Sequence, residues 1–231
     1  GVDNTGLNVF NLQLAGIDLE QRANENLQKG DNGVLIRVTG YNGTPNDSTV
    51  QIEIFASQGT ENPDGGSTGV KPKGTSADRW TIDQANVELP QLKSKERTDG
   101  YVRDGVLVAP NLSTNILIDA DISVSFRYGV LTATIESLGN NEYALRDGVV
   151  AGRWPISDAL LTLSRISDPS SADKRTPFCE TKSAFYTVGL QSLCAQTDVR
   201  ADNDNDGELP CDAVSTAMGF EALPGSLGKL V

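Results

Sequence analysis

Asn115–Tyr128 reads NILIDADISVSFRY, and its alternation of apolar and polar side chains decides the fold class. One face of an extended chain would carry Ile116, Ile118, Ala120, Ile122, Val124, Phe126 and Tyr128. The opposite face would carry Leu117, Asp119, Asp121, Ser123, Ser125 and Arg127. A period of two over this length is typical of a β-strand with one buried and one solvated face. We predict one long strand here, with a hairpin turn at Tyr128-Gly129 that leads into VLTATIES.

The β pattern extends over the chain up to about Trp154. Further strands are predicted at Leu7–Leu14, Val34–Tyr41, Thr49–Ser57, Arg79–Leu89 and Gly100–Ala109. One helix is predicted at Ile17–Gly30, where Asp18 can cap the first turn and Gly30 can end the last. The similar stretches RDGVLVA (Arg103–Ala109) and RDGVVAG (Arg146–Gly152) are each interpreted as an Asp-Gly turn before a strand.

From Trp154 onward the periodicity becomes helical. WPISDALLTLSRISD and SAFYTVGLQSLCA predict helices, and CDAVSTAMGFEALPGSLGKLV predicts a short helix followed by an extended end. The predicted fold is mainly β: an antiparallel, jelly-roll-like β-sandwich of about seven to ten strands with a mostly helical C-terminal segment. We expect residues 1–154 to form the sandwich and 155–231 to pack on it, with a single domain overall as the alternative.

Charge and hydropathy exclude two classes of partner. The chain has 31 acidic and 19 basic residues, a net charge of −12, and no cluster of lysine and arginine. Nucleic-acid binding requires such a cluster, so we expect no nucleic-acid partner. No window of the sequence is apolar for long enough to predict a transmembrane segment. The first residues, Gly1-Val2-Asp3, are typical of a mature N-terminus whose leader has been removed.

The chain contains no histidine, and this restricts its chemistry. Ser-His-Asp hydrolysis, Cys-His proteolysis, histidine-ligated metals and histidine general bases are all excluded. Polysaccharide hydrolysis by two carboxylates needs no histidine, and Asp119 and Asp121 are spaced compatibly with such a pair. The two tryptophans, Trp80 and Trp154, are expected in the core rather than as platforms for sugar rings. An enzyme is therefore the less favoured interpretation.

The stretch ADNDNDGELPCDA, Ala201 to Ala213, is a candidate ion site. The candidate calcium ligands are Asp202, Asp204, Asp206, Glu208 and Asp212. The first three match positions one, three and five of an EF-hand-like loop, but Pro210 and Ala213 stand where the later ligands should be. The sequence leaves two readings open: a solvated acidic loop, or a weak calcium site with a dissociation constant of roughly 10⁻⁴–10⁻³ M.

Three cysteines occur between Cys179 and Cys211, without the spacing or the histidines of a zinc site. This usage favours one disulfide in an oxidising compartment, with one cysteine left over. A bond between Cys194 and Cys211 would enclose the acidic stretch and stabilise the fold by about 3 kcal/mol. The alternative is three buried free thiols in a cytosolic protein.

The C-terminal region carries a resemblance. RDGVVAGRWPISDALLTL, then Cys194-Ala-Gln-Thr-Asp198, then PCDAVSTAMGFEALPGSLG resembles the tails of secreted, uncharacterised proteins and lipoproteins of myxobacteria and their relatives. Those tails share the order Asp-Gly-x-x-Ala-Gly-Arg-Trp, a cysteine, and Pro-Cys-Asp-Ala-x-Ser. The resemblance implies export and a bacterial source, and it transfers no catalytic residue.

The functional expectation is an exported, non-enzymatic β-sandwich that acts as a binding or surface-structural module outside the cell or on its surface. Calcium is its candidate cofactor, and a glycan or a protein its candidate ligand. The first alternative is the histidine-free polysaccharide hydrolase. The second is a subunit of an extracellular assembly that self-associates through strand edges or through the tail LPGSLGKLV.

Overall fold

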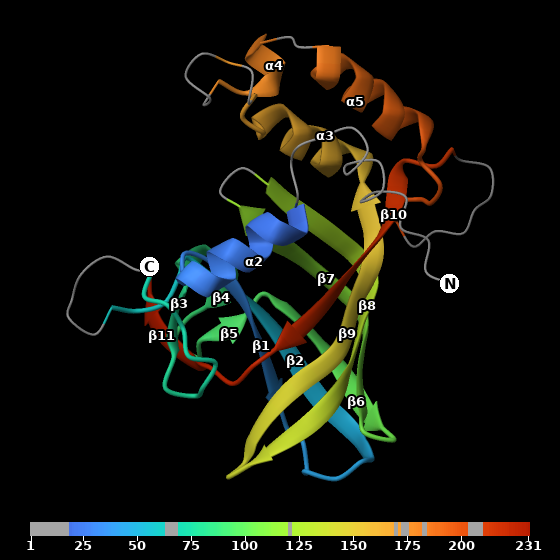
Figure 1. The fold of residues 1–231 in the computed structure, drawn as a ribbon. Coiled ribbons are helices and arrows are strands. Elements are labelled where there is room, and N and C mark those ends of the chain that lie inside the picture. The colour runs from blue at the N-terminus through green and yellow to red at the C-terminus, as the bar shows by residue number, and fades with distance from the viewer. Residues whose placement is uncertain are drawn as a thin grey trace.

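The computed structural model describes residues 19–62, 69–119, 122–168, 171, 176–181, 184–202 and 210–231. Its helices are α2 (Leu19–Lys29), η1 (Gln84–Asn86), α3 (Ile156–Arg165), α4 (Phe178–Thr181) and α5 (Ala184–Ala195). Its strands are β1 (Gly33–Thr39), β2 (Asp47–Ser57), β3 (Arg79–Ile82), β4 (Val87–Glu88), β5 (Lys93–Ser94), β6 (Glu96–Arg103), β7 (Val106–Asp119), β8 (Ile122–Gly139), β9 (Glu142–Pro155), β10 (Ala213–Ala222) and β11 (Ser226–Leu230). One antiparallel sheet with the strand order β1-β2-β6-β7-β8-β9-β10 dominates the molecule (Figure 1), which confirms the mainly β prediction.

The stretch that decides the fold class is a hairpin rather than one strand. β7 ends at Asp119, β8 begins at Ile122, and Ile116 lies opposite Val124. Opposed residues share a face of the sheet, so the apolar set of both strands points the same way. Ile118, Ile122 and Val124 are accordingly all buried. The prediction of a turn at Tyr128-Gly129 was wrong, because β8 continues through these residues to Gly139.

The large sheet bends sharply along one line across β7, β8 and β9. Asn111 and Tyr128 both have positive φ, 54° and 47°, and the pairing shifts its register beside each of them. Such bulges bend a strand and increase its twist. At the same level the backbones of Gly129 and Ala151 approach so closely that a Cβ on Gly129 would overlap the Ala151 carbonyl oxygen. A side chain at position 129 would therefore not fit unless the β9 backbone moved.

Curling brings distant strands of the sheet together around one core. Tyr41, just after β1, contacts Tyr143 of β9 edge to face, with ring centroids 5.5 Å apart. β1 and β9 lie far apart in the strand order, so a flat sheet would not permit this contact. The enclosed core takes apolar side chains from β2 and β6–β10 and from helices α2–α5. Trp154, at the end of β9, is fully buried within it.

A second layer covers the outer face of β1 and β2. Phe55 of β2 packs with Ile82 and Val87 from the two small sheets, β3–β11 and β4–β5. On the same face the fully enclosed Glu53 accepts hydrogen bonds from Arg37 Nε (2.7 Å) and from the Ser94 amide (3.0 Å). This layering is consistent with the predicted sandwich.

The predictions for the first part of the chain are confirmed for α2, β1 and β2. Helix α2 ends in a Schellman motif, in which the Gly30 amide bonds to the Leu27 carbonyl and the Asp31 amide to the Asn26 carbonyl. Gly30 supplies the positive φ, 76°, that this motif requires. The strand predicted at Leu7–Leu14 and the cap at Asp18 lie outside the described residues.

Three predictions in the middle of the chain need correction. Arg79–Leu89 is not one strand, because β3 ends at Ile82 and the short helix η1 precedes β4. Gly100–Ala109 is divided between β6 and β7 by a turn at Asp104-Gly105, both with positive φ. In the second Asp-Gly pair, Asp147 (φ 49°) forms a bulge within β9 instead of a turn before it.

The C-terminal segment contains the two predicted helices, α3 and α5, and also the short helix α4, which was not predicted, but it ends differently. Ala213–Ala222 was predicted to begin with a short helix and instead forms strand β10, paired along β9. Alternating burial of Val214, Thr216 and Met218 toward the core explains the strand better than helical spacing does. The tail then forms β11, which pairs in parallel with β3. Residues 155–231 therefore supply one edge strand of the main sheet.

The close approach at the bend yields a prediction for Gly129. Gly129→Ala should lower the free energy of unfolding by about 1–3 kcal/mol, because the new methyl group must displace the β9 backbone. Gly219→Ala, in β10 of the same sheet, is the matched control, since the nearest atom would be 3.8 Å from its Cβ. Urea denaturation of both variants measures the difference. Equal midpoints would contradict the role given to Gly129.

Candidate functional site

The acidic stretch is described only at its two ends. Asp204, Asp206 and Glu208 lie outside the described residues, whereas Asp202 and Asp212 are described. The Asp202 carboxylate accepts a hydrogen bond from Arg200 at 2.7 Å, and the Asp212 carboxylate accepts one from the Ala201 amide at 2.6 Å. Within the described part of the chain, no group of three acidic or cysteine side chains is placed to hold a metal ion. The two described candidate ligands are thus engaged by the protein's own donors.

Both ends of the acidic stretch are tied to the start of β10. Val199 pairs with Ala213 in a short antiparallel bridge. Beside it, Asp198 accepts hydrogen bonds from the amide of Ser215 at 2.7 Å and from its hydroxyl at 2.6 Å. We name residues 198–202 with 210–212, the described ends of this stretch, the acidic segment. Its position is therefore set by strand pairing.

Arg153 of β9 holds the acidic segment from the sheet side. Its guanidinium donates to the carbonyl oxygens of Arg200 (3.2 Å) and Asp202. Arg153 lies opposite Ser215 of β10 and opposite Arg127 of β8. Arg127 in turn reaches Asp158 of α3 at 3.4 Å. The acidic segment is consequently anchored at the end of the sheet nearest α3, at the top in Figure 1.

The predicted Cys194–Cys211 disulfide is not formed in the structure. All three cysteines are free thiols, with Cys194 and Cys211 exposed and Cys179 half-buried. The pairing of Val199 with Ala213 directs Cys211 toward Ala201, whereas Cys194 precedes Val199 at the end of α5. The Val199–Ala213 pairing, rather than a bond between these two cysteines, joins the two described ends of the acidic stretch.

Of the residues considered for carbohydrate chemistry, those that the structure describes are not assembled into a site. Asp119 forms an ion pair with Arg22 at 3.1 Å, and Asp121 lies outside the described residues. Trp154 is buried in the core as expected. Trp80 is half-buried and packs its ring on Gly33.

The described residues place a set of exposed and half-buried apolar side chains on β6, β7 and β8. We name this set, Tyr101, Val108, Pro110, Tyr128 and Val130, the outer patch. Tyr101 lies opposite Val108, and Pro110 lies opposite Val130, so neighbouring strands present these side chains together. Tyr101, Tyr128 and Val130 retain 40%, 48% and 38% of their accessible surface. Sequence analysis missed the outer patch, because its residues alternate with buried ones in the same way as ordinary solvent-facing positions.

The chemistry of the outer patch is that of contact rather than catalysis. None of its five side chains is charged or nucleophilic at neutral pH. Tyrosine combines a large apolar ring with a hydroxyl that can donate and accept hydrogen bonds. Apolar side chains gathered on a rigid sheet are typical of ligand or protein contact surfaces.

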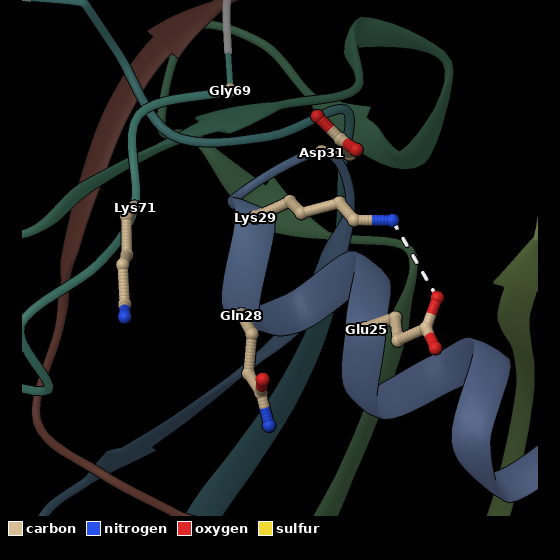
Figure 2. Close-up of a pocket in the computed structure, with 6 residues that line it drawn as sticks. All are labelled: Glu25, Gln28, Lys29, Asp31, Gly69 and Lys71. Carbon is tan, nitrogen blue, oxygen red and sulfur yellow. Dashed lines mark ion pairs between the residues drawn. The ribbon is translucent and has the colours of Figure 1, made fainter.

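A shallow depression lies between the end of α2 and the loop at Gly69 (Figure 2). Its lining is mixed in charge: Glu25, Gln28, Lys29, Asp31, Gly69 and Lys71. Lys29 pairs with Glu25 at 3.5 Å, whereas Gln28 and Lys71 extend away from that pair. The hydrogen bond from Gln21 and the charge of Lys29 lower the pKa of Glu25. These side chains do not converge on a common point, so the depression is not favoured as a site.

One titratable group is partly enclosed at the start of β6. Glu96 accepts hydrogen bonds from the Thr114 hydroxyl and from the Asn115 amide, the latter at 3.4 Å. Burial raises the pKa of Glu96 above its usual 4.5, although both hydrogen bonds act in the opposite direction. The carboxyl thus belongs to the packing of β6 against β7.

Comparison with known proteins adds no relative. No family model matches the chain, and no curated protein or solved structure matches it either.

The raised pKa of Glu96 predicts a pH dependence. The folded state retains the Glu96 proton to a higher pH than the unfolded state, so its contribution to stability falls as pH rises from about 4.5 through the raised pKa. Glu96→Gln should match the wild type in acid and exceed its free energy of unfolding at neutral pH, since the amide oxygen can still accept both hydrogen bonds. Urea denaturation across this range measures it, with the exposed Glu20→Gln as control. A loss of stability that is equal at every pH would contradict the assignment.

Proposed function

We propose that the protein is an exported, non-enzymatic binding module whose contact surface is the outer patch. The observation that carries the proposal is the exposure of Tyr101, Tyr128 and Val130 on one face of an otherwise well-packed sheet. Such side chains keep their apolar surface in contact with water unless a ligand or partner covers them. Burying one contributes about 1.5–3 kcal/mol to the free energy of binding. A bound partner would recover this free energy.

The chemistry of the chain supports binding over catalysis. Without histidine, the remaining route to hydrolysis is a pair of carboxylates. Asp119, one of the two candidates, is engaged by Arg22. The geometry of the described residues therefore gives no support to the alternative hydrolase.

Export and a position outside the cell, or on its surface, form part of the same proposal. They are supported by the resemblance of the C-terminal region to secreted bacterial proteins and by the acidic, turn-rich composition. Over the described residues, no helix combines the length and apolar character needed to cross a bilayer.

Assembly through the C-terminal tail is the less favoured form of the proposal. Strand β11 pairs with β3 of its own chain, and Leu227 and Leu230 pack against the cluster around Phe55. The tail would have to leave this site before it could pair with a neighbour. Self-association through the tail thus requires the β3–β11 pairing to break first, whereas binding over the outer patch does not.

The proposal predicts that removal of the patch tyrosines abolishes binding. The probes are insoluble peptidoglycan, chitin, and beads carrying a peptide of alternating lysine and leucine. The wild-type protein should be retained by at least one probe. The double variant Tyr101→Ala, Tyr128→Ala should bind at least about tenfold more weakly, since an aromatic anchor contributes about 2 kcal/mol or more. Leu161→Ala, which removes an equally exposed side chain on α3, is the control. Retention by none of the probes, or equal retention of all three proteins, would contradict the proposal.

The proposal includes calcium as a cofactor that stabilises the fold. It therefore predicts that the unfolding temperature rises with calcium concentration. With a dissociation constant of about 1 mM, calcium at about 10 mM should add about 1.4 kcal/mol to the free energy of unfolding. Thermal unfolding with and without calcium measures it, and magnesium at equal ionic strength is the control. An unchanged midpoint would remove calcium from the proposal.

A further inference from the structure

Three asparagines of the chain begin the tripeptide Asn-x-Ser/Thr: Asn42, Asn46 and Asn111. This tripeptide, with any residue but proline in the middle, is the acceptor sequence for N-linked sugars in exported proteins. Such short sequences also recur by chance, so the sequence alone does not select among them. The structure does, because a glycosylating enzyme that acts on the folded chain has to reach the whole tripeptide.

The tripeptide Asn111–Ser113 lies within strand β7 and is held by the sheet. Its middle residue, Leu112, is fully buried and lies opposite Gly129 of β8. The Ser113 hydroxyl accepts a hydrogen bond from the Tyr128 amide at 3.3 Å. An enzyme could use this tripeptide only after β7 had separated from β8.

The second tripeptide, which begins at Asn46, is joined to the turn between β6 and β7. The side-chain oxygen of Asn46 accepts a hydrogen bond from the Asp104 amide at 3.1 Å, and the Pro45 carbonyl accepts one from the Gly105 amide at 2.8 Å. The third residue of this tripeptide, Ser48, lies within β2. The Asn46 side chain therefore already has a structural role in fixing the loop.

The third tripeptide lies in the loop between β1 and β2, at the bottom in Figure 1. Its residues Asn42, Gly43 and Thr44 are all exposed. The side-chain oxygen of Asn42 accepts hydrogen bonds from the Thr44 amide at 2.8 Å and from the Thr44 hydroxyl at 2.7 Å. Gly43 supplies the positive φ, 79°, of this turn. The two side chains that the acceptor sequence requires therefore meet at the surface of the folded chain.

The turn holds its shape through contacts within the loop. Asp47 accepts a hydrogen bond from the Asn42 backbone amide at 2.8 Å, and the Asn42 side-chain nitrogen donates to the Asn46 carbonyl at 3.3 Å. A side-chain amide nitrogen carries two hydrogens, so one hydrogen bond does not use both. An enzyme can engage Asn42 without breaking any strand pairing.

We propose that Asn42 is the attachment site of an N-linked sugar, transferred to the folded chain from a glycosyl diphosphate. In this reaction the Asn42 Nδ2 forms a bond to the anomeric carbon of the sugar. The bond from that carbon to a diphosphate oxygen breaks, the diphosphate leaves with the electron pair, and the amide nitrogen loses one proton. The diphosphate belongs either to a sugar nucleotide or to a lipid-linked sugar. This site goes beyond the binding function and shares only export with it.

Site-resolved mass spectrometry of the protein from its own cells tests the site. The peptide that carries Asn42 should be heavier by the mass of a sugar, and its fragments should place the sugar on Asn42 rather than on Asn46. The peptide that carries Asn111 should be unmodified. Unmodified Asn42, or a sugar on Asn46 or Asn111 alone, would overturn the proposal.

Substitutions at the third residue of the tripeptide test the requirement for its hydroxyl. Thr44→Ala removes the hydroxyl and should abolish the added mass, whereas Thr44→Ser keeps the hydroxyl and should preserve it. Ser113→Ala, the matched change in the strand tripeptide, should leave the added mass unchanged. Thermal unfolding of each variant confirms that it is folded. Sugar that persists on Asn42 in Thr44→Ala would contradict the assignment.

The cytosolic and exported pools of the protein distinguish the two donors. Sugar on the exported pool alone indicates a lipid-linked donor, and sugar on both pools indicates a sugar nucleotide; either result supports the site. The same pools separate the site from the proposed function. Unmodified Asn42 in an exported protein rejects the site and keeps export, whereas glycosylated Asn42 in a protein that is never exported keeps the site and rejects export.

Discussion

The fold depends on one steric constraint, the close approach of the β8 and β9 backbones at Gly129 and Ala151. A side chain at position 129 would force the strands apart. With bulges at Asn111 and Tyr128 on the neighbouring strands, the sheet bends there and encloses a single core. Tyr128, at one of these bulges, is exposed.

Much of the fold could be predicted from the sequence, because burial on one face imposes a period of two. The mainly β class and the helices α2, α3 and α5 all follow from periodicity. The turn between β7 and β8 could not be found in this way. Ile116 lies opposite Val124, so the apolar positions of β7 and β8 keep the same parity along the chain, and a hairpin has the same pattern as one long strand. The β10 error has a related cause: small and apolar residues at Ala213–Met218 fit both periods, and pairing with β9 decides between them.

The candidate site was less accessible to sequence reasoning. The carboxylates of the acidic stretch were visible, but the groups that hold the stretch in place come from β9 and β10. Arg153 donates to the carbonyl oxygens of Arg200 and Asp202, and Ser215 donates to the Asp198 carboxylate just before the stretch. The Val199–Ala213 bridge, which joins the two described ends of this stretch, is likewise a tertiary feature. The outer patch combines residues from three strands, and no local signal distinguishes an exposed tyrosine that lies beside other apolar residues from one that stands alone.

The parallel pairing of β3 with β11 has a consequence for the order of folding. β3 is made well before its hydrogen-bonded neighbour Ser226–Leu230, whose Leu227 and Leu230 pack against the cluster that contains Ile82. Contacts between segments so distant in sequence form slowly, because a long loop must close first. During synthesis the layer over β1 and β2 therefore stays incomplete until Ser226–Leu230 has been made.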